Sequence, residues 1–394
     1  MTIAGRIFLR AERDRPVRGG NPWIFSQAIG RADPQSLIAG DWVEVYDIGG
    51  DLLGLGYVNP QTTIAVRMLT FGPSLAPDEI IAHRMRRAFD LRARIIPAGT
   101  DCYRLLNGDG DGLSGVVIDR YGEVAVMQLL TAGADRMRDT IVLQLQELIG
   151  PRSIIERSQG AVRRQEGLSD RVANLAGEPV SEIVVNENGI RLLVDFDHGQ
   201  KTGAFVDQRD NRLYVRHFAE GLRVLDACCY SGGFTLNALA GGAAQVTAID
   251  TSARALGWAL RNLELNGYAA GRVNLLEGDA APFLATTSER FDLIILDPPP
   301  FARSLKDAQR AAHLYTDLNA YAMRALAPGG ALMTFSCSAH FHGEDFVRAV
   351  RIAQSKVGRN LRTLDRLGPA PDHPVLLGHP EGEYLSGLML ADLG

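Results

Sequence analysis

The sequence predicts an α/β protein in which a parallel sheet covered by helices follows a small β-barrel and a small α+β domain. Two features lead to this prediction. From about residue 183 onward, continuous apolar runs of strand length alternate with amphipathic helical stretches, the pattern of a parallel sheet covered on both faces. Residues 1 to about 72 instead hold short β-rich runs broken by Gly, Asn and Pro, as a small barrel does. At about 150 residues per domain, we expect three domains, at 1–73, 74–182 and 183–394.

Local patterns predict the elements of the first two domains. The runs "DWVEVYD", "LLGLGYV" and "TIAVRML" are expected to be barrel strands. Residues 74–96 combine helix-start residues, charges and apolar residues at spacings of three and four, so we expect a connecting helix. From about 100 to 180, the strand-like runs "GVVIDRY" and "EVAVMQLL" surround one helix, "MRDTIVLQLQELI", which indicates a small α+β domain.

The third domain is expected to carry the chemistry. Its predicted strands are "LRVLDAC", "QVTAID", "VNLLEG", "FDLIILD" and "ALMTFS", with helices between them. In open parallel sheets, ligands bind outside the carboxyl ends of the strands, near the point where the strand order reverses. The unusual residues of this domain all fall at such strand ends, so we expect the site there.

Composition narrows the class of protein. With 46% hydrophobic and 22% charged residues, the chain is typical of a globular domain protein. No apolar run reaches the roughly 18 residues of a membrane helix, and the first residues lack the apolar core of a signal peptide. We therefore expect a cytoplasmic protein without a membrane partner. Its four cysteines are too few for a disulfide scaffold and lack the paired spacing of a zinc site, so we expect no metal.

Basic residues gather in two places, although the net charge is −5. Either group is a solvated face or a set of phosphate contacts, and the sequence leaves both open. The first group is Arg6, Arg10, Arg13, Arg15 and Arg18, and the second is Arg84, Arg86, Arg87, Arg92 and Arg94.

Three acids lie at the ends of the first three strands of the third domain. Asp226, Asp250 and Asp279 hold these positions, where an acid typically accepts hydrogen bonds from ribose hydroxyls. Together they suit a cationic, hydroxyl-rich adenosine ligand better than a pyrophosphate, which they would repel. The alternative is that each acid only caps the following helix. The loop after Asp226 leads to a helix N-terminus that a ligand can approach closely, and it contains Tyr230, Ser231 and Gly232.

The fourth strand ends in the unusual segment "DPPPF". Proline fixes φ and lacks an N–H group, so Pro298 and Pro299 present a stiff row of carbonyl acceptors. An exocyclic base amine needs acceptors and an extruded base needs a stacking partner, which Phe301 can supply. Asp297 can hold the edge of the base and, when protonated, donate to ring N3. A purely structural loop is the alternative.

The motifs taken together resemble a known family. The set "VLDACCYSGGF", "AID", "NLELNG", "EGDA", "FDLIILDPPPF" and "TFSCS" resembles the class I S-adenosylmethionine-dependent methyltransferases. More closely, the chain resembles the bacterial large-subunit rRNA cytosine-C5 methyltransferases, which join an N-terminal PUA domain, a central α+β domain and a Rossmann-like domain. "NPWIFSQAI", "YRLLNGDGDGLSGVVIDRYG", "GQKTGAFVDQRDNR" and "PEGEYLSGLML" match further segments, so the resemblance covers nearly the whole chain. The chain departs from the pattern at Cys228 and Tyr230, which are glycine in many methyltransferases.

The resemblance implies a reaction. S-adenosylmethionine is the expected cofactor, and Asp207 and Arg209 of "VDQRDNR" are expected to close its site. Cys337 in "TFSCSAHF" matches the nucleophile of the RNA cytosine-C5 enzymes. A thiolate that adds to C6 of a pyrimidine turns C5 into a nucleophile; a buried, inert cysteine is the alternative. Many of these enzymes carry a second cysteine where this chain has Pro299.

We therefore expect methyl transfer to C5 of a cytidine in 23S rRNA or a large-subunit precursor. The PUA-like region and the arginine-rich segments are expected to hold the RNA backbone, and a homodimer is one of the assemblies left open. Two alternatives remain. One is methylation of an rRNA guanine or exocyclic amine by the same fold, and the other is a non-catalytic RNA-binding assembly factor.

Overall fold

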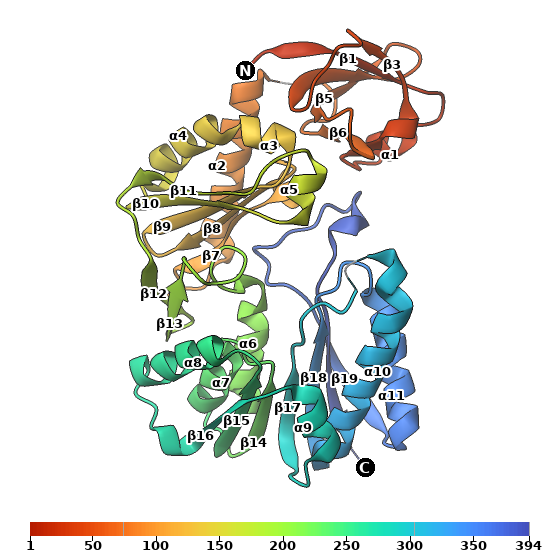
Figure 1. Cartoon of the computed structure of the whole chain (residues 1–394). Coiled ribbons are helices and arrows are strands. Elements are labelled where there is room, and N and C mark those ends of the chain that lie inside the picture. Colours follow the sequence, from red (N-terminus) through yellow and green to blue (C-terminus); the bar gives the residue numbers. More distant parts are fainter. Residues whose placement is uncertain (74, 303, 394) are drawn as a thin grey trace. The chain divides into compact units, whose positions relative to one another are not determined.

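A computed structural model of the chain describes residues 1–73, 75–302 and 304–393. Residue 74, at which the expected second domain begins, and residue 394, at which the third ends, lie outside them. The described chain divides into two compact units (Figure 1). The first comprises residues 1–185, 194–206 and 371–382, and the second comprises 186–193, 207–370 and 383–394. The hairpin of β12 (Glu182–Glu187) and β13 (Ile190–Asp195) carries the chain between them.

The first unit begins with a six-stranded sheet in the order β2-β6-β5-β4-β1-β3. Apolar side chains such as Ile7, Val43, Val45 and Val66 form a core on one face of the sheet. Successive side chains of a strand point to opposite faces, and on the other face Trp42 and Tyr57 are buried in the core shared with the five-stranded sheet. The strands are β1 (Ile3–Leu9), β2 (Trp23–Phe25), β3 (Ile29–Asp33), β4 (Asp41–Tyr46), β5 (Leu52–Val58) and β6 (Ile64–Met68), and α1 (Arg15–Arg18) lies between β1 and β2.

The rest of the first unit is a five-stranded sheet in the order β11-β10-β9-β8-β7, with α2 (Pro77–Ile95) and α4 (Arg138–Ile149) packed against it. Ile81, Met85 and Ala88 of α2 recur at helical spacing and are buried, so helix periodicity predicted this element correctly. The strands are β7 (Cys102–Asn107), β8 (Val116–Tyr121), β9 (Val124–Leu129), β10 (Ser153–Ser158) and β11 (Arg171–Gly177). Two short helices, α3 (Ala132–Arg136) and α5 (Ala161–Gln165), accompany α4, where the sequence indicated a single helix.

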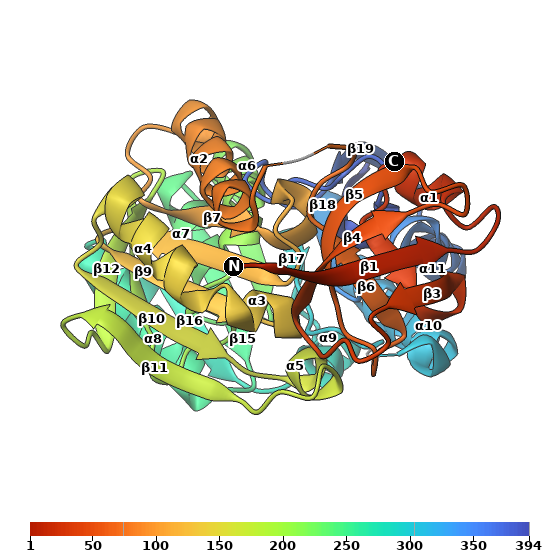
Figure 2. The same ribbon diagram turned by 90° about the horizontal axis from the view of Figure 1, so that it is seen from above.

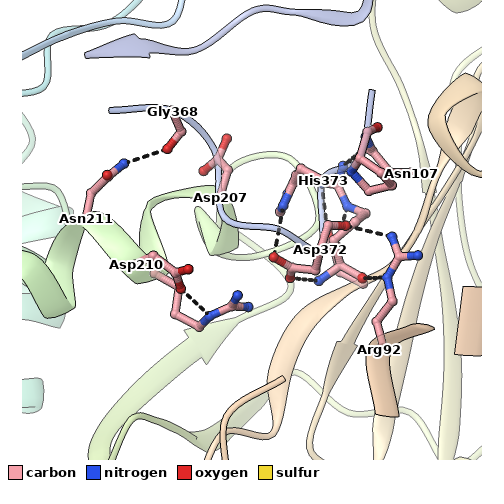
Figure 3. A network of polar contacts seen from close by, with 12 residues as sticks. Arg92, Asn107, Asp207, Asp210, Asn211, Gly368, Asp372 and His373 are labelled. Carbon is pink, nitrogen blue, oxygen red and sulfur yellow. Dashed lines mark hydrogen bonds and ion pairs between the residues drawn. The ribbon is translucent and has the colours of Figure 1, made fainter. Parts of the chain in front are cut away.

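A segment from near the C-terminus completes the first unit. Residues 371–382 pack against the five-stranded sheet, where the buried Arg92 guanidinium donates to the Asp372 carbonyl at 2.6 Å and forms an ion pair with Asp111 (Figure 3). The Asp372 carboxylate in turn accepts the Arg104 N–H at 2.8 Å. A buried arginine with all of these acceptors is a structural anchor. Arg92 therefore has no part in a solvated or phosphate-binding face.

The second unit is built on a seven-stranded sheet in the order β16-β15-β14-β17-β18-β20-β19. The first five strands are parallel, while β20 runs antiparallel to both of its neighbours. The strand order therefore reverses between β14 and β17. The strands are β14 (Arg223–Ala227), β15 (Gln245–Asp250), β16 (Val273–Glu277), β17 (Phe291–Leu296), β18 (Leu326–Ser336), β19 (Leu361–Leu367) and β20 (Ser386–Asp392).

Helices cover both faces of this sheet (Figure 1). On one face, the helices α9, α10 and α11 form the larger apolar core with the central strands; this core includes Ile294 and Leu332 from the strands and Tyr315 from α10. The helices α6, α7 and α8 lie on the other face. Strands covered in this way read as continuous apolar runs, which is why the sequence predicted them. The helices are α6 (Arg209–Phe218), α7 (Gly233–Ala240), α8 (Ala253–Leu265), α9 (Ala280–Thr286), α10 (Ala308–Ala325) and α11 (Gly343–Val357).

Candidate active site at the carboxyl ends of the parallel strands

The loop between β14 and α7 is held in an unusual backbone conformation. Cys228, Tyr230 and Gly232 have φ values of 66°, 49° and 79°, and a left-handed conformation costs a residue with a Cβ roughly 1–2 kcal/mol. Hydrogen bonds offset this cost: the Tyr230 N–H donates to Asp250 Oδ2 at 2.8 Å, and the Gly232 N–H donates to the Cys229 carbonyl at 2.9 Å. The loop therefore adopts a backbone conformation that favours glycine, although Cys228 and Tyr230 carry side chains there. The hydrogen bond from the Tyr230 N–H to Asp250 holds the loop in place.

The three strand-end acids make different contacts. Asp226 is fully buried and its Oδ2 accepts both the N–H and the hydroxyl of Thr235, at 2.9 and 2.7 Å, while Oδ1 accepts no hydrogen bond from the described residues. Burial raises the Asp226 pKa to about 6. Asp250 accepts backbone N–H groups through both oxygens, and the exposed Asp279 caps α9 through Oδ1. Helix capping therefore accounts for part of the acid pattern but leaves the buried Oδ1 of Asp226 unused.

Tyr230 and Ser231 are half-buried beside α8. The Tyr230 ring meets Trp258 edge-on, with 5.6 Å between the ring centroids, and the Ser231 carbonyl accepts the Asn262 amide at 2.9 Å. These contacts place both residues at the carboxyl ends of β14 and β15.

Asp297 follows β17 on the other side of the switch point. Its backbone N–H donates to the Ala227 carbonyl at 3.3 Å, so it lies next to the end of β14. Burial and the negative charge of Asp207 raise the pKa of Asp297 to about 7, although the Gln208 side chain hydrogen-bonds the carboxylate and opposes the shift. The raised pKa favours the protonated form of the Asp297 carboxyl group, in which it can donate as well as accept a hydrogen bond.

Cys337 lies directly beyond β18 and faces the proline segment. Its Sγ lies 3.6 Å from the Pro298 carbonyl, to which the thiol donates, and the side chain is half-buried. Pro298 is buried, whereas Pro299 is exposed. Sheet order brings these loops together, because β17 and β18 are parallel neighbours.

The two loops are joined by a buried brace formed by Ser338 and Tyr315. Ser338 Oγ accepts the Ala302 N–H at 3.3 Å and lies 3.0 Å from the Tyr315 hydroxyl. The Phe301 ring packs on Tyr315 at 4.7 Å between centroids, and Tyr315 stacks on Phe341 at 5.3 Å. Part of the Phe301 ring is therefore used in the protein core, and the brace fixes the separation of Pro298 and Cys337.

The upstream segment is anchored to the end of the sheet. Asp207 is buried; its carbonyl accepts the Ala370 N–H at 2.9 Å and its carboxylate accepts the Tyr384 hydroxyl at 2.8 Å. Arg209 is fully buried and donates to Asp210 Oδ1 at 2.9 Å. The Asn211 amide donates to the Gly368 carbonyl at 2.9 Å (Figure 3). This segment therefore holds the start of α6 against the chain that follows β19.

Comparison with known proteins identifies the family. A family described as S-adenosylmethionine-dependent methyltransferase matches residues 156–378. The chain belongs to this methyltransferase family. A PUA-like domain matches residues 7–71, so the predicted fold class and the predicted cofactor, S-adenosylmethionine, are confirmed.

Relatives span nearly the whole chain. A protein named ribosomal RNA large subunit methyltransferase I from Alteromonas mediterranea is 38% identical over 98% of both chains. A protein of the same name from Escherichia coli K12 is 37% identical over 97% of this chain and 98% of its own. A solved structure of a putative methyltransferase complexed with SAH has a TM-score of 0.85 at 22% identity, covering 99% of this chain and 100% of that one. A putative SAM-dependent methyltransferase from Streptococcus mutans has a TM-score of 0.84 at 22% identity over the same shares.

Sequence reasoning about this methyltransferase missed the residues that support the site. Gln208, Tyr315 and Ser338 contact Asp297 or join the two loops, and none of them is a typical catalytic group. Gln208 and Ser338 do lie within the quoted motifs "VDQR" and "SCS". Their position beside Arg209 and Cys337 was the available signal.

The described residues form neither a metal-binding cluster nor a membrane-spanning helix. No group of three or more His, Cys, Asp or Glu side chains there is arranged to hold a metal ion. Among the same residues, none of the helices has the length and apolar character needed to cross a membrane.

Proposed function

We propose that this protein transfers a methyl group from S-adenosylmethionine to C5 of a cytidine in large-subunit ribosomal RNA, through a covalent adduct with Cys337. The names of its relatives and its PUA-like domain support the RNA substrate. The observation that carries the cytosine-C5 chemistry is the Cys337 thiol, 3.6 Å from the Pro298 carbonyl in the segment that Asp297 begins. A nucleophile beside a row of acceptors suits a pyrimidine that carries an amino group.

The residues at the ends of β14 to β16 fit the methyl donor. The buried Oδ1 of Asp226 is an acceptor without a partner among the described residues, as the ammonium group of a bound amino acid moiety requires. Asp250 and Asp279 would accept the ribose hydroxyls, with Tyr230, Ser231 and Gly232 forming the loop against the ligand. Asp207 and Arg209 would close the site. When bound, the donor supplies an electrophilic methyl group.

Asp297 and the proline segment suit the base. In its protonated form, Asp297 donates to ring N3, and this polarises the ring toward attack at C6. In the structure, the Pro298 carbonyl accepts a hydrogen bond from the Cys337 thiol. Once the thiol has lost its proton, that carbonyl can accept a hydrogen bond from the exocyclic amine of the base. Pro299, which is exposed, offers a second carbonyl, and the outer part of Phe301 offers a stacking face.

In the proposed reaction, each bond that Cys337 and the base form is matched by a bond that breaks. Its thiolate forms an S–C6 bond, and the displaced electron pair makes C5 a nucleophile. C5 takes the methyl group, then loses its proton to a base, and the electrons that remain expel the thiolate from C6. The product is 5-methylcytidine, and Cys337 is regenerated.

RNA that contains 5-fluorocytidine tests this proposal. Fluorine cannot leave C5 as a cation, so the adduct should accumulate on Cys337, detectable on a denaturing gel and by peptide mass spectrometry. Cys337→Ala should lose both the adduct and methylation, whereas Cys102→Ala, which removes a thiol in β7, should keep both. A Cys337→Ala enzyme that methylates guanine or an exocyclic amine at the full rate would establish the alternative reaction. Unchanged rRNA methylation after gene deletion would favour an assembly factor instead.

A further inference from the structure

The two arginine groups differ in how their charge is compensated. Three arginines of the N-terminal group, Arg6, Arg15 and Arg18, form ion pairs with nearby carboxylates. Arg18, for example, lies 2.6 Å from both Asp14 and Asp47. The other pairs are Arg6 with Glu44 at 3.2 Å and Arg15 with Glu12 at 3.3 Å. Arg10 and Arg13 are also exposed, and among the described residues neither forms an ion pair with a carboxylate; the Arg10 guanidinium donates to the Ile29 carbonyl at 3.0 Å. The positive charge of this group is therefore compensated in part.

The arginines of α2 are not neutralised in this way. Apart from Arg92, which is buried against Asp111, none of them forms an ion pair with a carboxylate among the described residues. Arg86, Arg87 and Arg94 are exposed and Arg84 is half-buried. The charge of this helix is therefore available to a partner.

Helix geometry puts the three exposed arginines on one face. At 3.6 residues per turn, Arg86, Arg87 and Arg94 lie within about a third of the circumference, on the side away from Met85 and Ala88. Arg86 and Arg94 are separated by about 12 Å along the axis at 1.5 Å per residue. The same face also holds one histidine, His83, and two acids, Asp90 and Glu79; the Glu79 carboxylate accepts the Ala76 N–H at the start of the helix. Figure 2 shows α2 at the rim of the first unit, beside β7.

Positive charges crowd one another along this helix. The Arg84 guanidinium donates to the Leu69 carbonyl at 3.0 Å, and burial together with the charge of Arg87 lowers its pKa. Like charges held this close are mutually destabilising unless an anion lies between them. With Arg84, this side of α2 carries four guanidinium groups against the carboxylates of Asp90 and Glu79. A net positive charge remains, and a polyanion would neutralise it.

We propose that the outer face of α2, formed by Arg86, Arg87 and Arg94 with Arg84 beside them, binds phosphate groups of the RNA substrate. The choice of RNA rests on the proposed function, since RNA is the polyanion on which such an enzyme acts. Arg6, Arg15 and Arg18 do not share this role, because carboxylates already pair with them. The surface thus fixes the RNA backbone without reading bases.

The test compares two triple variants with equal loss of charge. Arg86→Gln, Arg87→Gln and Arg94→Gln together remove the proposed surface, and glutamine keeps the helix propensity. Arg6→Gln, Arg15→Gln and Arg18→Gln form the matched control. Binding of a large-subunit rRNA fragment is measured by fluorescence anisotropy in the absence of methyl donor. The salt concentration is varied between 50 and 200 mM, a range of roughly fourfold. Circular dichroism verifies that both variants keep their helices.

Each lost contact with single-stranded RNA should reduce the magnitude of the slope of log K against log salt by about 0.7, so three contacts should reduce it by about 2. The control should keep the wild-type slope. At saturating RNA the α2 variant should methylate at the wild-type rate, with a raised KM. A wild-type slope in the α2 variant, or an equal loss in the control, would overturn the proposal. Because binding is measured without methyl donor, the assignment of the methylated atom can fail while this result stands.

Discussion

Replacing Asp297 by asparagine should remove a pH dependence from the stability of the folded protein. The Asp297 pKa is raised from 3.8 to about 7, so the folded state retains a proton that the unfolded state releases. The stability from this group is present below about pH 4 and is lost as the pH rises through about 7. A shift of about three units at 1.36 kcal/mol per unit corresponds to about 4 kcal/mol. Asparagine does not titrate, so the variant should lack this loss.

Urea unfolding of wild type and Asp297→Asn at about pH 4 and about pH 8 measures the effect. The other titrating groups are common to both proteins, so the difference in pH dependence isolates Asp297. Methyl transfer at saturating RNA gives a second readout, because asparagine retains a donor toward ring N3 and should remove the decline in rate through about pH 7. If the two proteins lose equal stability between these pH values, the carboxyl group is ionised throughout and the N3 role fails.

Two further substitutions test the framework of the second unit. Ser338→Ala leaves the buried Ala302 N–H without its acceptor and removes one of the two serine partners of the Tyr315 hydroxyl. It should therefore cost about 1–3 kcal/mol and slow adduct formation at Cys337, while Tyr315→Phe should cost only about 1 kcal/mol. Equal effects of the two substitutions on thermal unfolding would contradict the brace. Arg212→Ala leaves the buried Glu187 carboxylate without its counter-ion and should cost about 3–5 kcal/mol. Arg223→Ala, which breaks an exposed ion pair with Glu289, should cost less than about 1 kcal/mol. The urea unfolding midpoints of Arg212→Ala and Arg223→Ala measure this difference in stability.

The parallel sheet was predictable because burial on both faces leaves a strong signal. The apolar runs that end at Asp226, Asp250 and Asp297 coincide with β14, β15 and β17 to within a few residues. The same topology explains why Cys337 contacts Pro298, since parallel neighbours end at the same edge. Their roles in catalysis remain predictions.

Contacts between distant segments could not be predicted. Nothing in the pattern of residues 371–382 indicates that they pack in the first unit, because the partners of Asp372 are Arg92 and Arg104, far away in the chain. Ion pairing of Arg18 likewise depends on Asp47, 29 residues further on. The position of Arg92, in contrast, was predictable: helical spacing from Met85 and Ala88 places it on the buried face of α2, apart from the exposed arginines with which its sequence neighbourhood groups it.

The site holds two kinds of thiol, and their surroundings separate them chemically. Cys228 and Cys229 follow β14, where burial raises their pKa values and the charges of nearby acids, including Asp250, raise them further. A protonated thiol is a poor nucleophile, so the acids that suit a cationic methyl donor also make these two cysteines unreactive. Cys337 lies across the switch point, at the end of β18, with its Sγ on the Pro298 carbonyl. The proposed methyl-donor site and the proposed nucleophile thus lie at the ends of different strands, as expected if the thiolate attacks C6 of the base while C5 of the same base attacks the methyl group.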